Sequence, residues 1–231
     1  MPEFAWTRIE TDATELSAGF FLDTGKLADS AFLACLTLEE CDSARRMADA
    51  GERRHFLMRR AFQRAFVAAV SGWTGELAAL PLTPRRDERP HSPAAAGLCL
   101  SFSSSGPIAL AAAARDGMIG IDVEAVRPIA DASGLARRFF SAEEAGAIAL
   151  LPSERQAEAF QRMWTIKEAA LKAIGKGVVY GLDTFAVTGL TVAPPKEFRH
   201  GWRWNVTELS VASGYIATLV WARETDPSET C

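Results

Sequence analysis

The most informative stretch of this 231-residue chain is Gly120-Ile121-Asp122-Val123-Glu124. It indicates how the second half of the chain folds. The segment belongs to a short apolar run bounded by turn residues, a pattern that predicts a β-strand. Side chains two positions apart on a strand point to the same face of its sheet. We therefore expect the carboxylates of Asp122 and Glu124 to lie side by side.

A second stretch, Trp164-Thr165-Ile166-Lys167-Glu168-Ala169-Ala170-Leu171-Lys172, begins forty residues after Glu124 and predicts a helix. An aromatic, an acidic and a basic side chain recur along one stripe of it, at Phe160, Trp164, Glu168 and Lys172. Mg²⁺ prefers oxygen ligands, commonly one or two carboxylates together with substrate phosphates. A third carboxylate from Glu168 would complete the ligands that the protein supplies, and Lys172 would reach a phosphate.

Each stretch alone also fits an ordinary structural role. An acidic pair at the end of a strand is often a solvated edge, and a helix face with alternating charges is often an exposed ladder of ion pairs. Their combination in one chain is what indicates phosphate chemistry at a metal ion.

The two stretches resemble the signatures of the 4′-phosphopantetheinyl transferases, in particular the surfactin-type branch. The shared pattern is G-[IV]-D-[VI]-E, then [FW]-[ST]-x-K-E-[AS]-x-x-K, then Gly175-Lys176-Gly177, and the resemblance spans about residues 101–181. That family moves the phosphopantetheine arm of coenzyme A to a serine of an apo acyl or peptidyl carrier protein and releases 3′,5′-ADP. The resemblance implies the same activity here, with coenzyme A as substrate and Mg²⁺, or alternatively Mn²⁺, as metal.

The resemblance also implies roles for the site residues. Asp122, Glu124 and Glu168 would hold the metal against the pyrophosphate of coenzyme A. Lys172 would bind the same pyrophosphate or give a proton to the departing ADP. Two residues remain as alternative bases for the acceptor serine: Glu168 itself and Glu144, which follows Phe139-Phe140-Ser141 as in the family's R-F-F-S-x-x-E segment.

Further residues are implied to contact coenzyme A: Arg54 or His55, Arg89, Pro90, Ser103, Ser104, Ser105 and Lys172. Arg54 is favoured over His55 for the 3′-phosphate because a guanidinium binds phosphate through two parallel hydrogen bonds. Arg89 and Pro90 correspond to the family's G-K-P stretch. Ser104 stands where relatives carry a histidine, so the cation at that place is lost and we expect weaker coenzyme A binding.

The order of the expected elements, helices followed by strands in residues 37–114 and again in 141–221, predicts an α+β protein. The resemblance implies two similar α+β halves with pseudo-twofold symmetry and the active site at their interface. We expect residues 1–115 to form the N-terminal half with the coenzyme A phosphate contacts. Residues 116–231 would form the C-terminal half with the metal and catalytic motifs, and two halves in one chain favour a monomer.

The expected helices cover residues 37–50, 52–70 and about 152–174, and a further one begins at residue 141. The expected strands cover residues 98–102, 108–114, 118–123, 185–192, 202–209 and 215–221. Thr37 and Ser141 are the predicted caps of two helices, and Gly72 and Gly175 end two. Arginines gather between residues 45 and 64, and we interpret most of them as solvated helix faces.

Composition narrows the class of protein. The net charge of 25 − 29 = −4 gives no overall basic field for nucleic acid. No apolar run approaches 18 residues and the N-terminus has no apolar signal core, so we expect neither a membrane span nor export. The four cysteines have no zinc or disulfide spacing, which indicates a reducing compartment, the cytoplasm.

Two other functions compete with the transferase. One is a non-catalytic homologue that binds coenzyme A or a carrier protein, its turnover lost with the histidine that Ser104 replaces. The other is an Mg²⁺-dependent nucleotide hydrolase that uses water in place of serine. Intact Asp122, Glu124 and Glu168 favour the transferase, and carriers of fatty acid, polyketide and nonribosomal peptide biosynthesis all stay open as partners.

Overall fold

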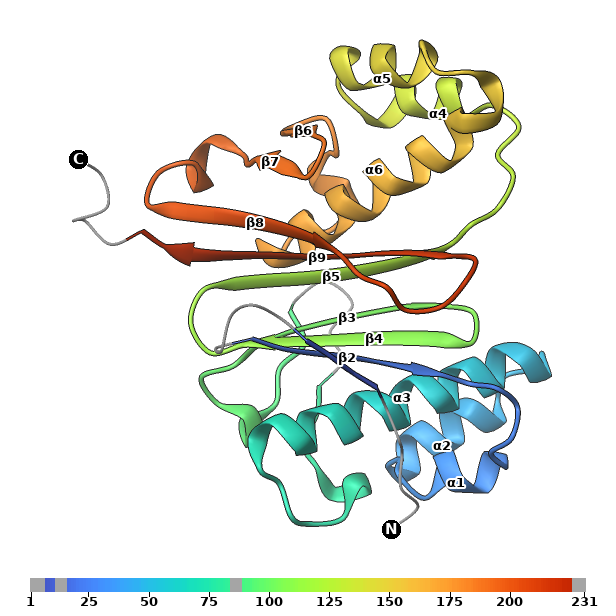
Figure 1. Cartoon of the computed structure of the whole chain (residues 1–231). Helices are drawn as coiled ribbons and strands as arrows, with labels where there is room; N and C mark the ends of the chain where they lie inside the picture. Colours follow the sequence, from blue (N-terminus) through green and yellow to red (C-terminus); the bar gives the residue numbers. More distant parts are fainter. Residues whose placement is uncertain (1–6, 11–15, 84–88, 226–231) are drawn as a thin grey trace. The chain divides into compact units, whose positions relative to one another are not determined.

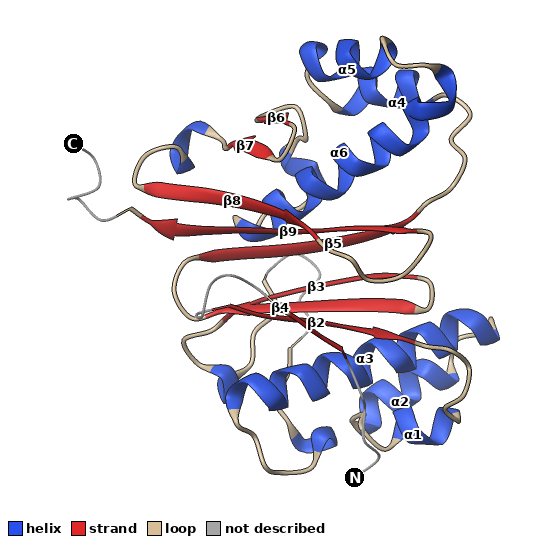
Figure 2. Cartoon of the chain, viewed as in Figure 1, coloured by secondary structure: helices blue, strands red, loops and turns tan. Residues whose placement is uncertain are grey.

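The computed structural model describes residues 7–10, 16–83 and 89–225 (Figure 1). The chain divides into two compact units: unit 1 comprises residues 1–86 and 90–115, and unit 2 comprises residues 87–89 and 116–231. Each unit contains helices and antiparallel strands, so the predicted α+β class is confirmed (Figure 2). The pseudo-twofold relation of two halves stays a prediction.

Unit 1 is built on a four-stranded antiparallel sheet of order β1-β2-β4-β3. Its strands are β1 (Thr7–Ile9), β2 (Leu16–Leu22), β3 (Cys99–Ser105) and β4 (Ile108–Ala114). The strand expected over residues 108–114 is confirmed. The first two strands were not predicted, because the pattern along residues 7–22 has too few alternating positions to separate a strand from a loop.

The helices of unit 1 are α1 (Asp29–Leu33), α2 (Leu38–Arg45) and α3 (Ala50–Ser71), with short 3₁₀ turns at Leu77–Ala79 and Pro93–Ala95. Thr37 caps α2 through the predicted capping box. The expected helix over residues 37–50 is wrong beyond Arg45, because Asp49 caps a new helix. Gly72 ends α3 with φ +71°, as predicted. This helix packs against β4 and β2.

Two of the arginines on α3 are buried, so the interpretation as solvated helix faces, made for most of the arginines, does not extend to these two. The side chains of Arg60 and Arg64 are 6% and 2% exposed, and both are paired with Glu40 of α2. Arg64 also donates to the carbonyl oxygen of Leu77, 3.1 Å away. A guanidinium with several donors can join three chain segments in this way. These buried ion pairs therefore connect α2 and α3 within the core of unit 1.

Glu40→Gln is expected to destabilise the fold by about 1 to 3 kcal/mol near pH 7, because two buried guanidinium groups lose their charged acceptor. Burial raises the pKa of Glu40, but Arg60, the Thr37 amide and Arg64 outweigh it and hold the pKa below its ordinary value. A lowered folded pKa contributes stability above the unfolded pKa, and this stability disappears as the pH falls through the folded pKa. Urea unfolding from pH 7 to pH 3 should therefore show the two proteins converging in acid; a constant gap would contradict the assignment.

Unit 2 is built on a three-stranded antiparallel sheet of order β5-β9-β8. Its strands are β5 (Met118–Ala125), β8 (Trp202–Glu208) and β9 (Tyr215–Glu224). The expected strand over residues 185–192 is instead a hairpin of β6 (Ala186–Thr188) and β7 (Thr191–Ala193). Gly189 turns the chain there with φ +57°.

The helices of unit 2 are α4 (Ala132–Phe139), α5 (Ala142–Ala149) and α6 (Ser153–Ala173), with short 3₁₀ turns at Val178–Tyr180 and Lys196–Phe198. Ser141 caps α5 and Gly175 follows α6 with φ +71°, both as predicted. Figure 1 shows α6 along one face of the sheet, with α4 and α5 near its N-terminal end. The helix packs against β5 and β9, so it lies over the strand that carries Asp122.

Two compositional expectations can be compared with the described residues. Cys35, Cys41 and Cys99 form no disulfide in this part of the chain. None of the described helices combines the length and the apolar character that crossing a membrane requires.

Candidate active site

Gly120 brings α6 close to the strand that carries the acidic pair. A Cβ at this position would lie 1.8 Å from the carbonyl oxygen of Ala169 and 2.6 Å from the amide nitrogen of Ala173. Because glycine has no Cβ, the helix backbone can rest directly on the strand. The helix residues that face Gly120, Ala169 and Ala173, are small, so α6 and β5 can lie close together.

Gly120→Ala is expected to push α6 away from β5 and to destabilise the fold by about 1 to 3 kcal/mol, the usual range for overpacking. The clash is with backbone atoms, which cannot swing aside as a long side chain does. Denaturant unfolding measures the loss. Gly146→Ala is the matched control, since a Cβ at Gly146 meets no atom within 4 Å; equal effects at both glycines would refute the close-packing role.

The approach of α6 puts Lys172 against Asp122. The Lys172 Nζ atom lies 2.7 Å from Oδ1 of Asp122 and 3.3 Å from the carbonyl oxygen of Ile121. Asp122 is buried, whereas the side chain of Lys172 is 29% exposed. Lys172 therefore places one positive charge between the buried Asp122 and the solvent.

Glu168 lies in the electric field of the same acidic pair. Burial, with smaller contributions from Asp122 and Glu124, raises the pKa of Glu168 to about 7 against the lowering effect of Lys172. Burial and Asp122 likewise raise the pKa of Glu124, against the positive charges of Arg127 and Lys172. The three predicted acids therefore repel one another, and the nearby cations offset this only in part.

The arrangement of Asp122, Glu124 and Glu168 can be compared with what a metal ion requires of its ligands. Within the described ranges, no three His, Cys, Asp or Glu side chains are arranged as the ligands of one metal ion. The chemistry of the set does suit a hard divalent cation, which would relieve the repulsion that raises the pKa of Glu124 and Glu168. Binding would require the carboxylates to close around the ion, and the metal site stays a prediction.

Three neighbouring residues of the sheet fix the rotation of α6. They lie opposite one another on β5, β9 and β8, and each binds one α6 side chain. The pairs are Asp122–Lys172, Thr218–Thr165 and Glu208–Arg162. The two threonine hydroxyls are 3.1 Å apart and fully buried. Sequence reasoning missed the threonine pair, because no local pattern tells which strand residue will face Thr165.

A pocket of about 170 Å³ opens beside Glu124. Its walls are mainly apolar and aromatic, with polar groups at a few points. The ring of Trp164 packs edge-on against that of Phe139 at 5.6 Å between centroids, and the ring of Phe160 lies 5.8 Å away. The lining residues are Glu124, Arg127, Ile129, Leu135, Phe139, Phe160, Gln161 and Trp164. The predicted stripe of α6 therefore supplies one wall of an apolar recess at the acidic site.

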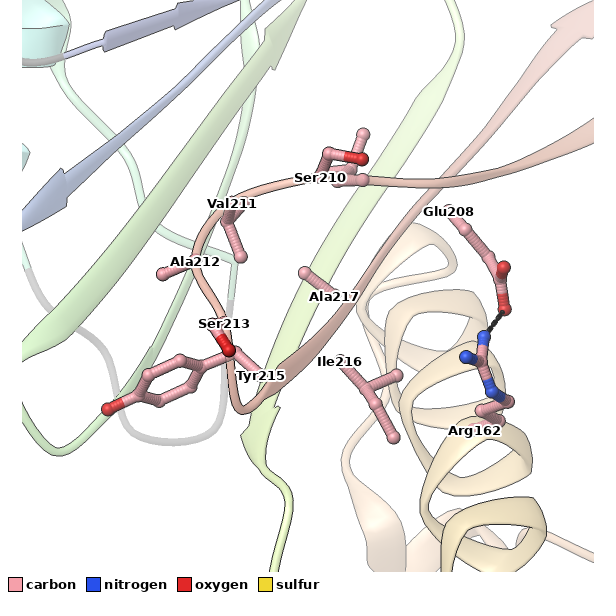
Figure 3. A pocket seen from close by; sticks show the side chains of 10 residues that line it. Arg162, Glu208, Ser210, Val211, Ala212, Ser213, Tyr215, Ile216 and Ala217 are labelled. Carbon is pink, nitrogen blue, oxygen red and sulfur yellow. Dashed lines mark hydrogen bonds and ion pairs between the residues drawn. The ribbon is translucent and has the colours of Figure 1, made fainter.

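A larger hollow of about 480 Å³ lies under the loop between β8 and β9 (Figure 3). Figure 3 shows the loop residues from Ser210 to Ser213 arching over it, with the ion pair of Arg162 and Glu208 at one side. None of the predicted site residues lines this hollow. Size alone therefore does not mark the reactive centre.

Glu144, the alternative base, is buried in a structural network. One of its carboxylate oxygens lies 2.8 Å from Lys167 Nζ and accepts the N–H of Val187, and the other accepts the N–H of Ser141. Lys167 is fully buried and also donates to the carbonyl oxygens of Leu182 and Phe185, each 2.7 Å away. Both oxygens of Glu144 are occupied by protein donors, so this geometry favours Glu168 as the base.

The residues expected to contact coenzyme A are divided between the two units. Unit 1 contains Arg54, His55, Pro90 and the β3 residues 103–105, and unit 2 contains Arg89 and Lys172. The guanidinium of Arg54 is paired with Asp23 and Asp29, each at 2.6 Å, and donates to the carbonyl oxygen of Leu27. A phosphate at Arg54 would have to compete with two carboxylates. The phosphate role of Arg54 stays a prediction.

Arg89 lies at the C-terminal end of α6. Its guanidinium donates to the carbonyl oxygen of Ala173, the residue after Lys172. A Cβ at Gly175 would approach Arg89 Nε to 2.8 Å, so the glycine leaves room for the arginine. A cation at this end of a helix is favourable, because the last carbonyl groups carry partial negative charge. The structure therefore brings Arg89 and Lys172 to the same end of α6.

Comparison with known proteins points to the same family. Residues 118–220, somewhat less than half of the chain, match the family model described as the 4′-phosphopantetheinyl transferase superfamily. This part of the chain is similar to that superfamily. The resemblance seen in the sequence is thereby confirmed, and the acids of β5 and the acid and lysine of α6 all lie within the matched range.

Individual transferases show the same similarity. The chain is 36% identical over 126 residues to the 4′-phosphopantetheinyl transferase HetI of a Nostoc species. This alignment covers 54% of this chain and 52% of HetI. It is 45% identical over 73 residues to psf-1 of Bacillus pumilus and 38% identical over 69 residues to Sfp of Bacillus subtilis. Those two alignments cover 32% and 30% of this chain and 30% of each relative. The chain thus matches about half the length of HetI and less of the other two transferases.

Proposed function

We propose that this chain transfers the 4′-phosphopantetheine arm of coenzyme A to a serine hydroxyl of an apo acyl or peptidyl carrier protein. The observation that carries the proposal is the Lys172–Asp122 pair beside Glu168, within the part of the chain that matches the transferase superfamily. The site therefore combines a positive charge for a phosphate with a half-buried acid that can accept a proton.

Each step of the transfer has a group to perform it. The serine oxygen attacks the phosphorus that bears pantetheine, the bond from that phosphorus to the bridging oxygen breaks, and 3′,5′-ADP leaves. Glu168 takes the serine proton, and its pKa of about 7 suits a base at neutral pH. Lys172 binds the leaving phosphate, where negative charge grows. Mg²⁺ held by Asp122, Glu124 and Glu168 would neutralise charge on the pyrophosphate.

The apolar recess beside Glu124 supports a pantetheine substrate. In the arm of coenzyme A, the carbon next to the phosphate-bearing CH₂ carries two methyl groups, so an apolar surface has to lie close to the reacting phosphorus. The recess places Trp164, Phe160 and Phe139 next to a predicted metal ligand. We assign this recess to the methyl-bearing part of the arm.

The partners and location belong to the same proposal. Cysteines without a disulfide, among the residues that the structure describes, suit a cytoplasmic enzyme, and two units within one chain suit a monomer. Its partners would be coenzyme A and a carrier protein. Neither nucleic acid nor a membrane has a part in the reaction that we propose.

Intact-protein mass spectrometry tests the proposal. An apo carrier protein incubated with this chain, coenzyme A and Mg²⁺ should gain one phosphopantetheine, about 340 Da, and EDTA should prevent the gain. Carriers of fatty acid, polyketide and peptide synthesis are tested in parallel. Coenzyme A binding without any mass gain would favour the non-catalytic homologue, and 3′,5′-ADP release without a carrier would favour the hydrolase.

A further inference from the structure

Gln161 of α6 binds the backbone of the segment that follows the acidic strand. Its side chain is 4% exposed. The amide nitrogen donates to the carbonyl oxygen of Ala125 at 2.7 Å, and the amide oxygen accepts the N–H of Arg127 at 3.3 Å. We infer that Gln161 is a positioning residue, which holds Glu124 and Arg127 in place at the reactive site.

The peptide between Ala125 and Val126 is held from both sides. The Val126 N–H donates to the carbonyl oxygen of Gly214, 2.8 Å away, and the Ala125 carbonyl accepts from Gln161 on the opposite side. The carbonyl and N–H of one peptide point in opposite directions within a rigid plane. Two partners on opposite sides therefore fix the orientation of that plane.

Gln161 binds the chain at the end of the paired strand. The register of β5 with β9 ends at Ala125. The carboxamide of Gln161 offers one donor and one acceptor, and these bind the carbonyl oxygen of Ala125 and the N–H of Arg127, two residues further along.

This clamp lies between the two charged groups that frame the apolar recess. Glu124 immediately precedes the clamped peptide and Arg127 immediately follows it, and both line the recess together with Gln161. If the segment moved, the carboxylate and the guanidinium would move with it. A shift of about 1 Å in a reacting group can cost a hundredfold in rate.

The inference rests on the proposed transferase function, and the chain offers a matched control for it. Gln156 lies on the same helix and also binds through both ends of its amide. It accepts from Ser133 Oγ at 2.6 Å and donates to the Leu151 carbonyl at 2.9 Å. These partners belong to the region of α4 and α5 and do not line the recess.

The test compares Gln161→Met with Gln156→Met, because methionine keeps the length of glutamine and removes its hydrogen bonds. Hydrogen exchange followed by mass spectrometry reports protection of the backbone amides in residues 123–128. Transfer to a carrier protein is measured at a temperature where circular dichroism shows both variants folded. We expect Gln161→Met alone to lose protection there and to lower kcat about tenfold to a hundredfold, with the KM for coenzyme A changed less than threefold.

The outcomes separate the inference from the function on which it rests. Unchanged exchange in Gln161→Met, or a kcat equal to that of Gln156→Met, overturns the positioning role. If the wild-type protein transfers nothing, the proposed function fails, and the exchange data alone decide whether Gln161 holds the segment. Should Gln161→Met not fold, Gln161→Glu is measured instead, since it keeps the acceptor for Arg127 and loses the donor to Ala125.

Discussion

Glu168→Gln is expected to lower kcat for transfer by at least about 10³-fold, because a general base contributes about 10²-fold to 10⁴-fold and a predicted metal ligand is lost as well. The substitution keeps the shape of the side chain and removes its negative charge and its basicity. Single-turnover transfer to an apo carrier protein measures the loss. A variant with a rate within threefold of the wild type would refute the assignment of Glu168.

The same substitution should stabilise the protein at pH 8 in the presence of EDTA. The folded pKa of Glu168, about 7, lies above the ordinary value of 4.5. A group with a raised folded pKa contributes stability below its unfolded pKa, and this contribution is lost as the pH rises through the folded value. At pH 8 the half-buried charge of Glu168 opposes folding, and a neutral amide removes that opposition. Urea unfolding at pH 8 measures whether the free energy of unfolding of Glu168→Gln is higher than that of the wild type.

Glu158→Gln is the matched control for Glu168. Glu158 lies on the same helix, is paired with Arg162 at 3.0 Å and is 56% exposed. Exposed pairs of this kind contribute about 0 to 1 kcal/mol, so neither activity nor stability should change appreciably. If Glu168→Gln loses activity and gains stability while Glu158→Gln changes neither, Glu168 is a reactive group and not a structural one.

The sequence predicted the elements of the site because their patterns are local. A short apolar run between turn residues identifies β5, and the helical spacing of Phe160, Trp164, Glu168 and Lys172 identifies α6. Capping residues predicted the start of α5, since a hydroxyl three positions before a glutamate binds within its own turn. None of these inferences needs a partner from elsewhere in the chain.

Long-range pairing explains what the sequence could not predict. Arg60 and Arg64 look like surface charges until the fold brings Glu40 to them. Gln161 is an ordinary helix residue until the end of β5 lies against it. In each case the partner is twenty or more residues away along the chain, and only the packed structure shows which polar groups meet.

Glu144→Gln is expected to destabilise the fold by about 3 to 5 kcal/mol, the usual result of removing one member of a buried ion pair. The variant leaves the ammonium of Lys167, a fully buried residue, without its carboxylate. Burial already lowers the pKa of Lys167, and Glu144 opposes that effect. Thermal and urea unfolding measure the loss.

The kinetics of the same variant decide between the two candidate bases. If Glu168 is the base, Glu144→Gln should keep its kcat within about threefold at a temperature where it is folded, because a carboxylate whose oxygens already accept two N–H groups and an ammonium takes no part in the transfer. The double variant Glu144→Leu with Lys167→Met should recover part of the lost stability, since neither charge is left alone in the core. A folded Glu144→Gln protein with a hundredfold lower kcat would instead make Glu144 the base and assign Glu168 to the metal alone.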